Sequence, residues 1–503
     1  MTDAAQQGDI AALAKGGRTN FFGFLLRLAA RLPFLFIAGR LYGAAELGRF
    51  ASALVIVELL ALICSMGEKR GLAQRLSEGE GVRPANLVFD GMLMAVLFSC
   101  IAGVFLWFVP APMFPAGQYS TLDKLLVTAI PAYALTEILL AAQAYRYDIS
   151  TTVRARAVVE PWTLSIMAGV FYYLIPKSGL SLAYIASIYA GLFTAAWPFL
   201  RTYGLPRNWR PRPKEMWRMS SRAFPLATAD AIEWGTRRLD IFILGLFVAP
   251  AAVGIYYVAQ QVASLPQKLK TSFEPILGPV ITRNLKEKNF PAIARQVCQV
   301  GFWIVAAQAG IALALGVPGE AVMGLVGPNF VGGTGALVFL LAAEVVAATA
   351  VVSEAALVYV ARKRNLVISI GTIALQGVLT VAAILLMERM ALGDPYKAAG
   401  AAIALMVALG VASIVKAWVL SRILGERVNN WRWPLVWAAV PAIAVGYLAT
   451  RMPEWVELIF GIPLILLTYG SIIWRKGFGP EDRVLFRKNL GGEDAAAPRE
   501  GAG

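Results

Sequence analysis

The stretch from Arg222 to Arg283, RAFPLATADAIEWGTRRLDIFILGLFVAPAAVGIYYVAQQVASLPQKLKTSFEPILGPVITR, holds two long apolar segments that both carry charge. In the first segment, four ionisable side chains fall within roughly 80° of arc on a helix; they are Asp230, Glu233, Arg237 and Asp240. A charge at the centre of a bilayer costs roughly 3 kcal/mol or more, so these groups should face a partner or a wet cavity. The alternative interpretation is that internal ion pairs lock the helices together.

The second segment, from Val253 to Pro279, carries a polar stripe of its own. Its members recur at helical spacing, within about 40° of their mean direction; they are Gln260, Ser264, Gln267, Thr271 and Glu274. Lys268 lies beside this stripe. Two adjacent polar stripes exceed what helix packing requires, which favours a functional site over a packing device.

The composition sets the class of protein. The chain has 503 residues, 58% of them hydrophobic, and a mean hydropathy of +0.64, which is typical of a polytopic membrane protein. Because it contains no histidine, a histidine proton relay, a histidine metal site and a histidine-based catalytic triad are excluded. Cys64, Cys100 and Cys298 show no metal or redox spacing and are interpreted as packing residues. We therefore expect no catalytic residue, no metal site and no cofactor.

Apolar periodicity predicts an all-α polytopic membrane protein with about 14 transmembrane helices. The predicted spans are 20–40, 47–66, 86–109, 123–145, 155–176, 181–200, 222–248, 253–280, 294–316, 333–360, 365–387, 397–421, 433–450 and 455–474. Lys and Arg concentrate in the two tails and in alternate turns, which predicts a multi-pass protein with both termini cytoplasmic. This asymmetry explains most of the +15 net charge, so we do not expect nucleic-acid binding.

The chain repeats itself at an offset of about 206 residues. Arg31-Leu32 precedes GAAELGRF at 43–50, and Arg238-Leu239 precedes APAAVGIY at 249–256. In each copy a charged span leads into a very short external turn, and the next span then begins with a glycine and an aromatic residue. Each half would hold six spans in the same orientation, so a pseudo-two-fold axis along the membrane normal is expected.

These two half-starts resemble those of polysaccharide-biosynthesis oligosaccharide flippases, which belong to the multidrug/oligosaccharidyl-lipid/polysaccharide exporter superfamily. The resemblance rests on AGRLYGAAELGRFASALVIVELLALICSMG at 38–67 and RRLDIFILGLFVAPAAVGIYYVAQQV at 237–262, and it extends over roughly 20–424. It implies two parallel six-helix bundles that form a V around a central cavity. It also implies that a polyprenyl-pyrophosphate-linked oligosaccharide moves from the cytoplasmic to the outer leaflet of the cytoplasmic (inner) membrane by alternating access.

The expected organisation has six parts. They are a cytoplasmic N-terminal tail (1–19), a first six-helix bundle (20–201), a basic cytoplasmic linker (202–219), a second six-helix bundle (220–424), two additional transmembrane helices (425–474) and a cytoplasmic C-terminal tail (475–503). Besides the lipid-linked oligosaccharide we expect membrane lipids and the polymerase and chain-length proteins of polysaccharide synthesis as partners. We expect the protein itself to be a monomer.

The implied substrate needs a cationic, hydrated site for its pyrophosphate and polar groups for its sugars. The basic candidates are Arg27, Arg31, Arg237, Arg238 and Lys268. Paired guanidinium groups suit a pyrophosphate because their forked donors bind it at two points. Arg27 could instead snorkel to the cytoplasmic surface, which is also the interpretation favoured for Lys270 and Lys416. Gln260, Ser264 and Gln267 could bind sugar hydroxyls or hydrogen-bond between helices.

Acidic residues within spans form a second set, Glu58, Glu137, Glu160, Asp230, Glu233, Asp240, Glu344 and Glu354. Arg156 and Glu160 stand at i and i+4 and are predicted to form an ion pair. Without histidine, proton coupling would have to use carboxylates, whose pKa burial raises. Glu233 is the first candidate for ion coupling, with Asp230 and Asp240 beside it; the competing role for Glu233 is to pair with Arg237.

Three other functions compete with a polysaccharide flippase. A lipid-II flippase would share the cationic cavity, and a multidrug or cation antiporter would share the architecture but usually needs an acidic or aromatic cavity. A membrane glycan polymerase or glycosyltransferase usually needs a large charged external loop. The longest external segments predicted here, about 110–122 and 317–332, carry almost no ionisable side chains. The sequence therefore predicts a transporter of a lipid-linked glycan and not an enzyme.

Overall fold

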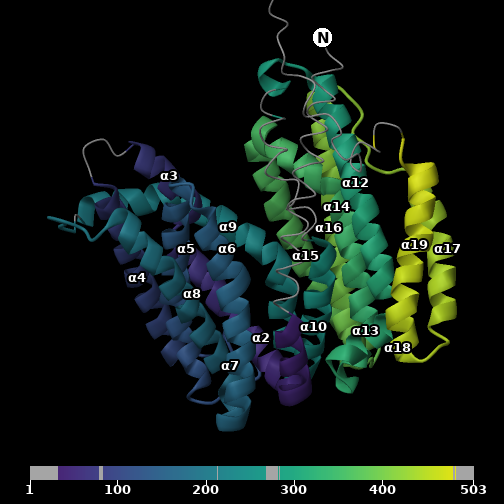
Figure 1. Cartoon of the computed structure of the whole chain (residues 1–503), viewed down its shortest axis with the longest axis horizontal. Helices are drawn as coiled ribbons and strands as arrows, with labels where there is room; N and C mark the ends of the chain where they lie inside the picture. Colours follow the sequence, from purple (N-terminus) through teal and green to yellow (C-terminus); the bar gives the residue numbers. More distant parts are fainter. Residues whose placement is uncertain are drawn as a thin grey trace, which may run out of the picture.

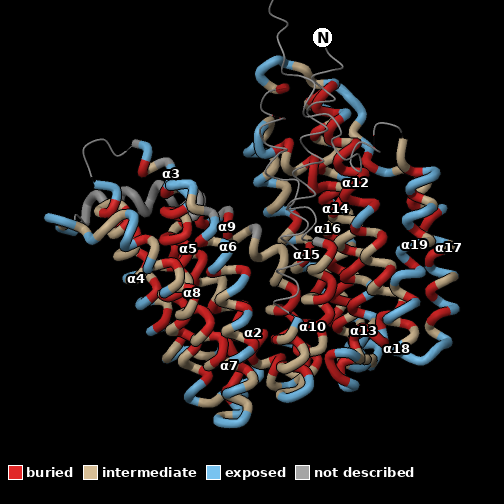
Figure 2. Tube along the Cα trace, in the orientation of Figure 1, coloured by how far each residue is buried: buried red, intermediate tan, exposed pale blue. Residues whose placement is uncertain are grey.

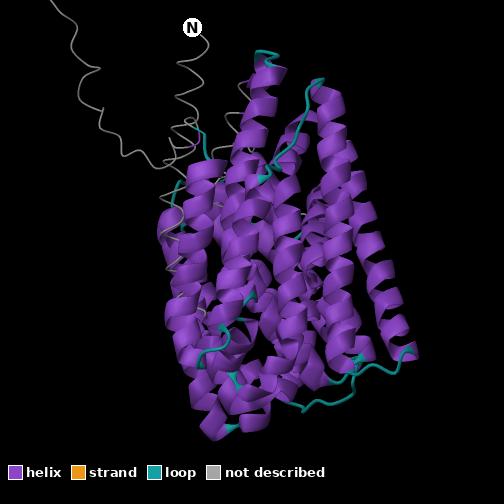
Figure 3. Cartoon of the chain, turned by 90° about the vertical axis from the view of Figure 1, so that its right-hand side faces the viewer, coloured by secondary structure: helices purple, strands orange, loops and turns teal. Residues whose placement is uncertain are grey.

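The computed structural model describes residues 32–78, 83–211, 213–267, 281, 284–479 and 482. Every regular element in these ranges is a helix, as the side view in Figure 3 shows. The expected all-α class is therefore confirmed. Ten of the described helices are long and apolar enough to cross a membrane, and a shorter apolar helix spans Pro434–Ala449. The number of 14 spans stays a prediction.

The helices of the first half follow one another with short connections, except for the longer segment between α4 and η2. They are η1 (Ala38–Tyr42), α2 (Gly43–Cys64), α3 (Glu68–Glu78), α4 (Pro84–Phe108), η2 (Asp123–Thr128), α5 (Ala129–Tyr145), α6 (Ile149–Val153), η3 (Arg154–Val159), α7 (Glu160–Leu174), η4 (Pro176–Ser178) and α8 (Gly179–Tyr203). The expected turn before α2 falls at Gly43, whose φ of +82° favours glycine. Gly43 follows the π-helix η1 directly and is the first residue of α2.

The second half contains the longest helices. They are α9 (Pro213–Phe247), α10 (Pro250–Gln267), α12 (Phe290–Gly316), α13 (Gly319–Val326), η6 (Pro328–Gly333), α14 (Thr334–Val360), α15 (Arg362–Arg389), α16 (Asp394–Leu424), α17 (Pro434–Ala449), α18 (Glu454–Val456), η7 (Glu457–Gly461), α19 (Ile462–Ile472) and η8 (Ile473–Gly477). Helix α9 begins inside the range expected for the basic linker. That linker lies against α4, because the Trp209 indole donates a 2.7 Å hydrogen bond to the buried Asp90 carboxylate.

Two groups of helices form a V in Figure 1. One arm holds α4 to α8, the other holds α12 to α16, and the arms meet at the end where α2 packs against α10. Helix α9 links the arms, since it contacts α4 in one and α15 in the other, and it also packs against α2 at their junction. The appended helices α17 and α19 pack on the outer side of α12.

Buried residues recur along the helices of both arms in Figure 2. One apolar core passes from α5 and α8 through α2 into α10, and a second joins α12 and α14 to α17 and α19. Small side chains allow close packing between membrane helices. Helix α16, for example, buries Ala401, Ala404, Ala408 and Ala412.

A polar contact fixes the C-terminal helices to the second arm. The buried Asp482 accepts hydrogen bonds from the Trp303 indole at 2.9 Å and from the Arg432 guanidinium at 2.7 Å. Trp303 lies on α12, whereas Arg432 precedes α17. The contact therefore joins α12 to the start and the end of the appended helix pair.

Candidate functional site

The carboxylate of Asp240 lies at the centre of a polar cluster between α9 and α10. It is fully buried and accepts a 2.5 Å hydrogen bond from the Tyr256 hydroxyl. The Gln260 side-chain amide donates to both of its oxygens, at 3.2 and 3.1 Å, and the backbone N–H of Ile241 donates at 2.9 Å. A buried carboxylate needs hydrogen-bond donors, because burial removes it from water. Two of the donors to Asp240 belong to α10, so these contacts join α9 to α10.

Gln260 extends the cluster to two arginines of α9. Its side-chain oxygen accepts a 3.1 Å hydrogen bond from Arg238, and its amide donates to the carbonyl oxygen of Arg237 at 2.9 Å. The Arg238 guanidinium also lies 6.0 Å from the ring centre of Tyr257, a cation–π distance. We call Arg237, Arg238, Asp240, Tyr256 and Gln260 the α9–α10 cluster.

The side chain of Arg237 differs from that of Arg238. It is half-buried, and within the described part of the chain its guanidinium makes neither a hydrogen bond nor an ion pair. A guanidinium that is partly removed from water without a partner is poised to bind an anion at two points. Among the predicted basic residues that the structure describes, Arg237 is therefore the candidate for an anion contact, and Arg238 supports the helix pair.

The remaining predicted site residues divide into three groups. Ser264 donates to the backbone oxygen of Gln261 at 2.7 Å, a contact within its own helix. Asp230 is buried and has a partner. Arg27, Arg31, Lys268 and Lys270 lie outside the described residues, as do the side chains of Glu233 and Gln267, whose backbones belong to α9 and α10.

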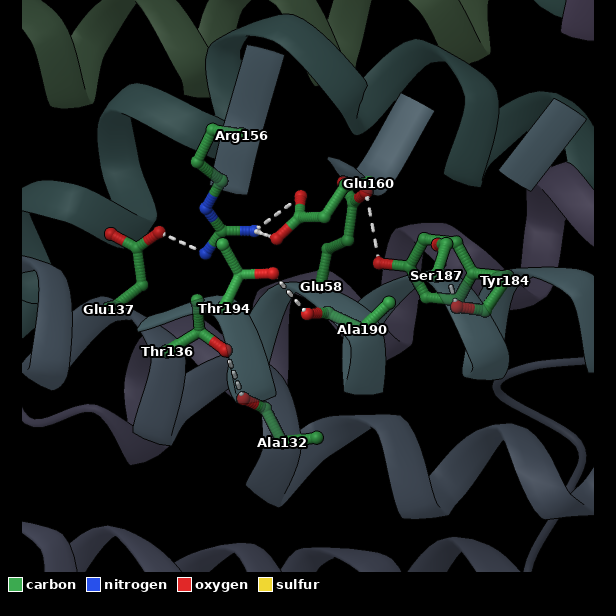
Figure 4. Close-up of polar contacts among 10 residues, drawn as sticks. All are labelled: Glu58, Ala132, Thr136, Glu137, Arg156, Glu160, Tyr184, Ser187, Ala190 and Thr194. Atoms are coloured by element: carbon green, nitrogen blue, oxygen red, sulfur yellow. Dashed lines mark hydrogen bonds and ion pairs between the residues drawn. The ribbon is translucent and has the colours of Figure 1, made fainter. Parts of the chain in front are cut away.

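A second polar cluster lies in the first arm, and Figure 4 shows it. The Arg156 guanidinium contacts both oxygens of Glu160 at 2.9 Å and also forms an ion pair with Glu137 of α5. It lies 4.4 Å from the ring centre of Tyr133. The predicted i, i+4 pair of Arg156 and Glu160 is confirmed. We call Glu58, Glu137, Arg156 and Glu160 the carboxylate cluster.

Glu58 connects the carboxylate cluster to α9. It accepts long hydrogen bonds from the Tyr184 hydroxyl at 3.5 Å and from the Trp234 indole at 3.4 Å. Trp234 belongs to α9, so this contact crosses from the first half of the chain to the second. Although three carboxylates gather here, no group of His, Cys, Asp or Glu in the described part of the chain is arranged to hold a metal ion.

One expectation about a basic residue is wrong. Lys416 was expected to snorkel toward the inner surface, yet its side chain is only 8% exposed and its ammonium lies 3.1 Å from the Glu354 carboxylate. The reason is that α14 and α16 pack closely along their length. Glu354 on α14 therefore offers a partner on the neighbouring helix, and a lysine with such a partner need not extend to the surface on its own.

The aromatic donors of both clusters, Tyr256, Tyr184 and Trp234, were not among the predicted site residues. Tyr256 stands one helical turn before Gln260, so extending the polar stripe of α10 by four residues would have included it. Tyr184 and Trp234 carry no such signal. Their contacts with Glu58 join residues that are more than 100 positions apart, and only the packing of α2 against α8 and α9 brings them together.

Comparison with known proteins adds a family match. The sequence profile of a family described as "Polysaccharide biosynthesis protein" matches residues 37–306. A comparison with curated proteins gave no match.

The fold is similar to several solved transporter structures. The lipid II flippase MurJ in an inward closed conformation aligns with a TM-score of 0.68 at 12% identity, over 92% of this chain and 98% of that chain. An inward-facing multidrug resistance MATE family transporter of the MOP superfamily aligns at 0.64 with 14% identity, over 80% and 98%. The Vibrio cholerae MATE transporter VcmN in its bent form aligns at 0.56 with 12% identity, over 83% and 98%. At these identities the likeness shows the fold.

Proposed function

Because the chain belongs to the polysaccharide biosynthesis protein family and has a transporter fold rather than that of an enzyme, we propose that it flips a polyprenyl-pyrophosphate-linked oligosaccharide across the cytoplasmic membrane. The oligosaccharide would be destined for a cell-surface polysaccharide, either lipopolysaccharide O-antigen or exopolysaccharide. Transport would proceed by alternating access between the two arms of the V.

The observation that carries this proposal is the guanidinium of Arg237. It lies on α9, the helix that contacts both arms, and it has no partner among the described residues. The pyrophosphate of a lipid-linked oligosaccharide offers the bidentate oxygens that such a group prefers. In our proposal Arg31 supplies the second guanidinium.

The first experiment replaces this guanidinium. We expect Arg237→Ala to abolish export of the surface glycan while protein level and membrane insertion stay normal, and Arg237→Lys to retain part of the export because lysine lacks the fork. Arg389→Ala, which removes an exposed guanidinium at the end of α15, is the matched control and should export normally. Normal export by the Arg31→Ala/Arg237→Ala double variant at the wild-type protein level would reject the anion site.

The lipid-II alternative is separated by a complementation assay. A polysaccharide flippase should restore the surface glycan in cells that lack their own O-antigen or exopolysaccharide flippase, and it should fail to support growth of cells depleted of their lipid II flippase. The opposite pattern would replace our proposal with lipid II transport.

Ion coupling is a separate part of the proposal. We assign it first to Glu233, because Asp240 already accepts several hydrogen bonds in a closed cluster. The ion must bind the inward- and outward-facing states with different affinity. Glu233→Gln should then remove the gradient dependence of transport in liposomes without removing substrate binding, whereas unchanged gradient dependence would leave Glu233 as the partner of Arg237.

The orientation in the membrane is also a proposal. Reporter fusions at Gly79, Arg210 and Gly492 should report the cytoplasm, and fusions at Gly117 and Gly332 should report the outside, because basic residues concentrate on the cytoplasmic side. This orientation would place the α2–α10 contact at the outer surface. One reversed site among the first three would contradict it.

A further inference from the structure

The α2–α10 contact is built on two glycines that face each other's backbone. A Cβ placed on Gly48 of α2 would overlap the carbonyl oxygen of Pro250 and lie 2.8 Å from the backbone nitrogen of Gly254. Conversely, a Cβ on Gly254 of α10 would overlap the carbonyl oxygen of Ala44 and lie 2.9 Å from the backbone nitrogen of Gly48. The two helices therefore touch backbone to backbone, and neither position has room for one methyl group.

The contact is reciprocal in the way that a two-fold axis requires. At the offset of about 206 residues expected for the repeat, Ala44 corresponds to Pro250 and Gly48 to Gly254. Each glycine thus lies against the residue one turn before its partner glycine. A symmetric contact of this kind pairs the same surface of both units.

A second pair of glycines at the same offset lies nearby. A Cβ on Gly39 would overlap Val326 of α13 and lie 3.2 Å from the Phe330 ring, so this glycine of the first half packs on the second. Its counterpart, Gly245 of α9, packs on the first half, where a Cβ would lie 3.1 Å from the Ser52 hydroxyl and 3.5 Å from Pro115. Each half therefore presents small residues to the other at this end of the V.

We propose that Gly48 and Gly254 form a gate that closes the outer end of the translocation path and separates once in every transport cycle. This inference rests on the proposed function, because alternating access requires a seal that can open. At this point the glycines let the two helices meet without interlocking side chains, so the contact between the two backbones consists of weak interactions. A methyl group at either position would force the helices apart by roughly 1–2 Å and so favour the outward-open state.

The test measures access to a residue just behind the gate. Ser52 lies one turn beyond Gly48 on α2 and is buried under Gly245. A Ser52→Cys reporter, in a chain whose Cys64, Cys100 and Cys298 are replaced by Ala, would be treated in intact cells with a membrane-impermeant maleimide. We expect slow labelling that reaches completion with the glycines intact, and labelling roughly fivefold faster or more with Gly48→Ala or Gly254→Ala.

Two glycines serve as matched controls. Gly169 of α7 and Gly371 of α15 have no heavy atom within 4 Å of an added Cβ, so Gly169→Ala and Gly371→Ala should leave the labelling rate unchanged. They carry the same substitution in a membrane helix without the contact. Faster labelling in these controls would mean that any added methyl loosens the protein, and it would overturn the assignment to the gate.

The remaining outcomes also decide the proposal. Labelling of the Gly48→Ala and Gly254→Ala variants at the original rate would show that the contact does not limit opening. If neither glycine variant accumulates in the membrane, the labelling of Ser52→Cys in the protein with both glycines intact decides. Absence of labelling there would show that the contact never opens, and it would reject the gate. Labelling only after permeabilisation would place this end inside. The labelling assay needs no substrate. If labelling follows the expected pattern but the protein exports no glycan, the proposed function is rejected and the proposed gate still stands.

Discussion

The two halves of the chain differ in the partners that they give to their half-buried arginines. In the first arm, Arg156 forms ion pairs with Glu137 and Glu160 and lies over the ring of Tyr133. Its charge is therefore neutralised inside the carboxylate cluster. In the α9–α10 cluster, Arg238 donates to a neutral amide and Arg237 has no partner among the described residues. The comparison separates an arginine whose charge is neutralised inside the protein from one whose guanidinium has no partner among the described residues, and only the second suits the anion contact that we propose.

The largest difference should appear when the two arginines are removed. Arg156→Ala leaves Glu137 and Glu160 without their shared cation, and breaking such a buried pair costs about 3 kcal/mol or more. Arg237→Ala removes a group without a described partner and should change stability by less than about 0.5 kcal/mol. Thermal denaturation of the purified variants in detergent measures this contrast. Equal melting temperatures for both would erase the distinction between the clusters.

A smaller difference should appear between two tyrosines. Tyr256 donates to the fully buried Asp240 at 2.5 Å, whereas Tyr184 donates to Glu58 at 3.5 Å, near the limit of a hydrogen bond. Tyr256→Phe should therefore destabilise the protein by about 2 kcal/mol, and Tyr184→Phe by about 0.5 kcal/mol or less. The same denaturation assay applies. A larger loss for Tyr184→Phe would show that Glu58 depends on its partners more than these distances indicate.

The smallest of the three contrasts is expected outside the predicted spans, at the start of the helix that carries Arg156. Asp148 caps α6, accepting hydrogen bonds from the Ser150 hydroxyl at 2.6 Å and the Thr151 backbone N–H at 3.2 Å. These bonds, chiefly the one from Ser150, lower the pKa of the Asp148 carboxyl below its usual value. Asp148→Ala should cost about 1 kcal/mol.

The pH dependence of this cap has a definite sign. Because the folded-state pKa is depressed, the stabilisation is complete above the unfolded value of about 3.9 and is lost as the pH falls through the lower folded value. The melting temperatures of the wild type and Asp148→Ala should therefore converge only at strongly acidic pH. A constant gap down to that pH would show that the carboxylate charge does not matter to the cap.

Much of the polar pattern could be predicted because it lies within single helices. The spacing of Arg156 and Glu160 predicted their ion pair, and the polar stripe of α10 included Gln260, which the structure joins to Asp240 and Arg238. Such pairs follow from the 3.6-residue period, which needs no knowledge of neighbouring helices. The prediction that Lys416 snorkels was wrong for the converse reason, since its partner Glu354 stands on another helix.

By itself the sequence determined the all-α membrane class, because apolar helical segments are what a bilayer accepts. It also placed polar residues on single faces of α9 and α10. Only the tertiary structure decided which charges are neutralised: Glu137 reaches Arg156 from α5, and Arg237 is left without a described partner. It alone also set Gly48 against Gly254. The physical reason is that contacts between helices depend on crossing angle and register, which the whole bundle sets through its packing and no single helix encodes.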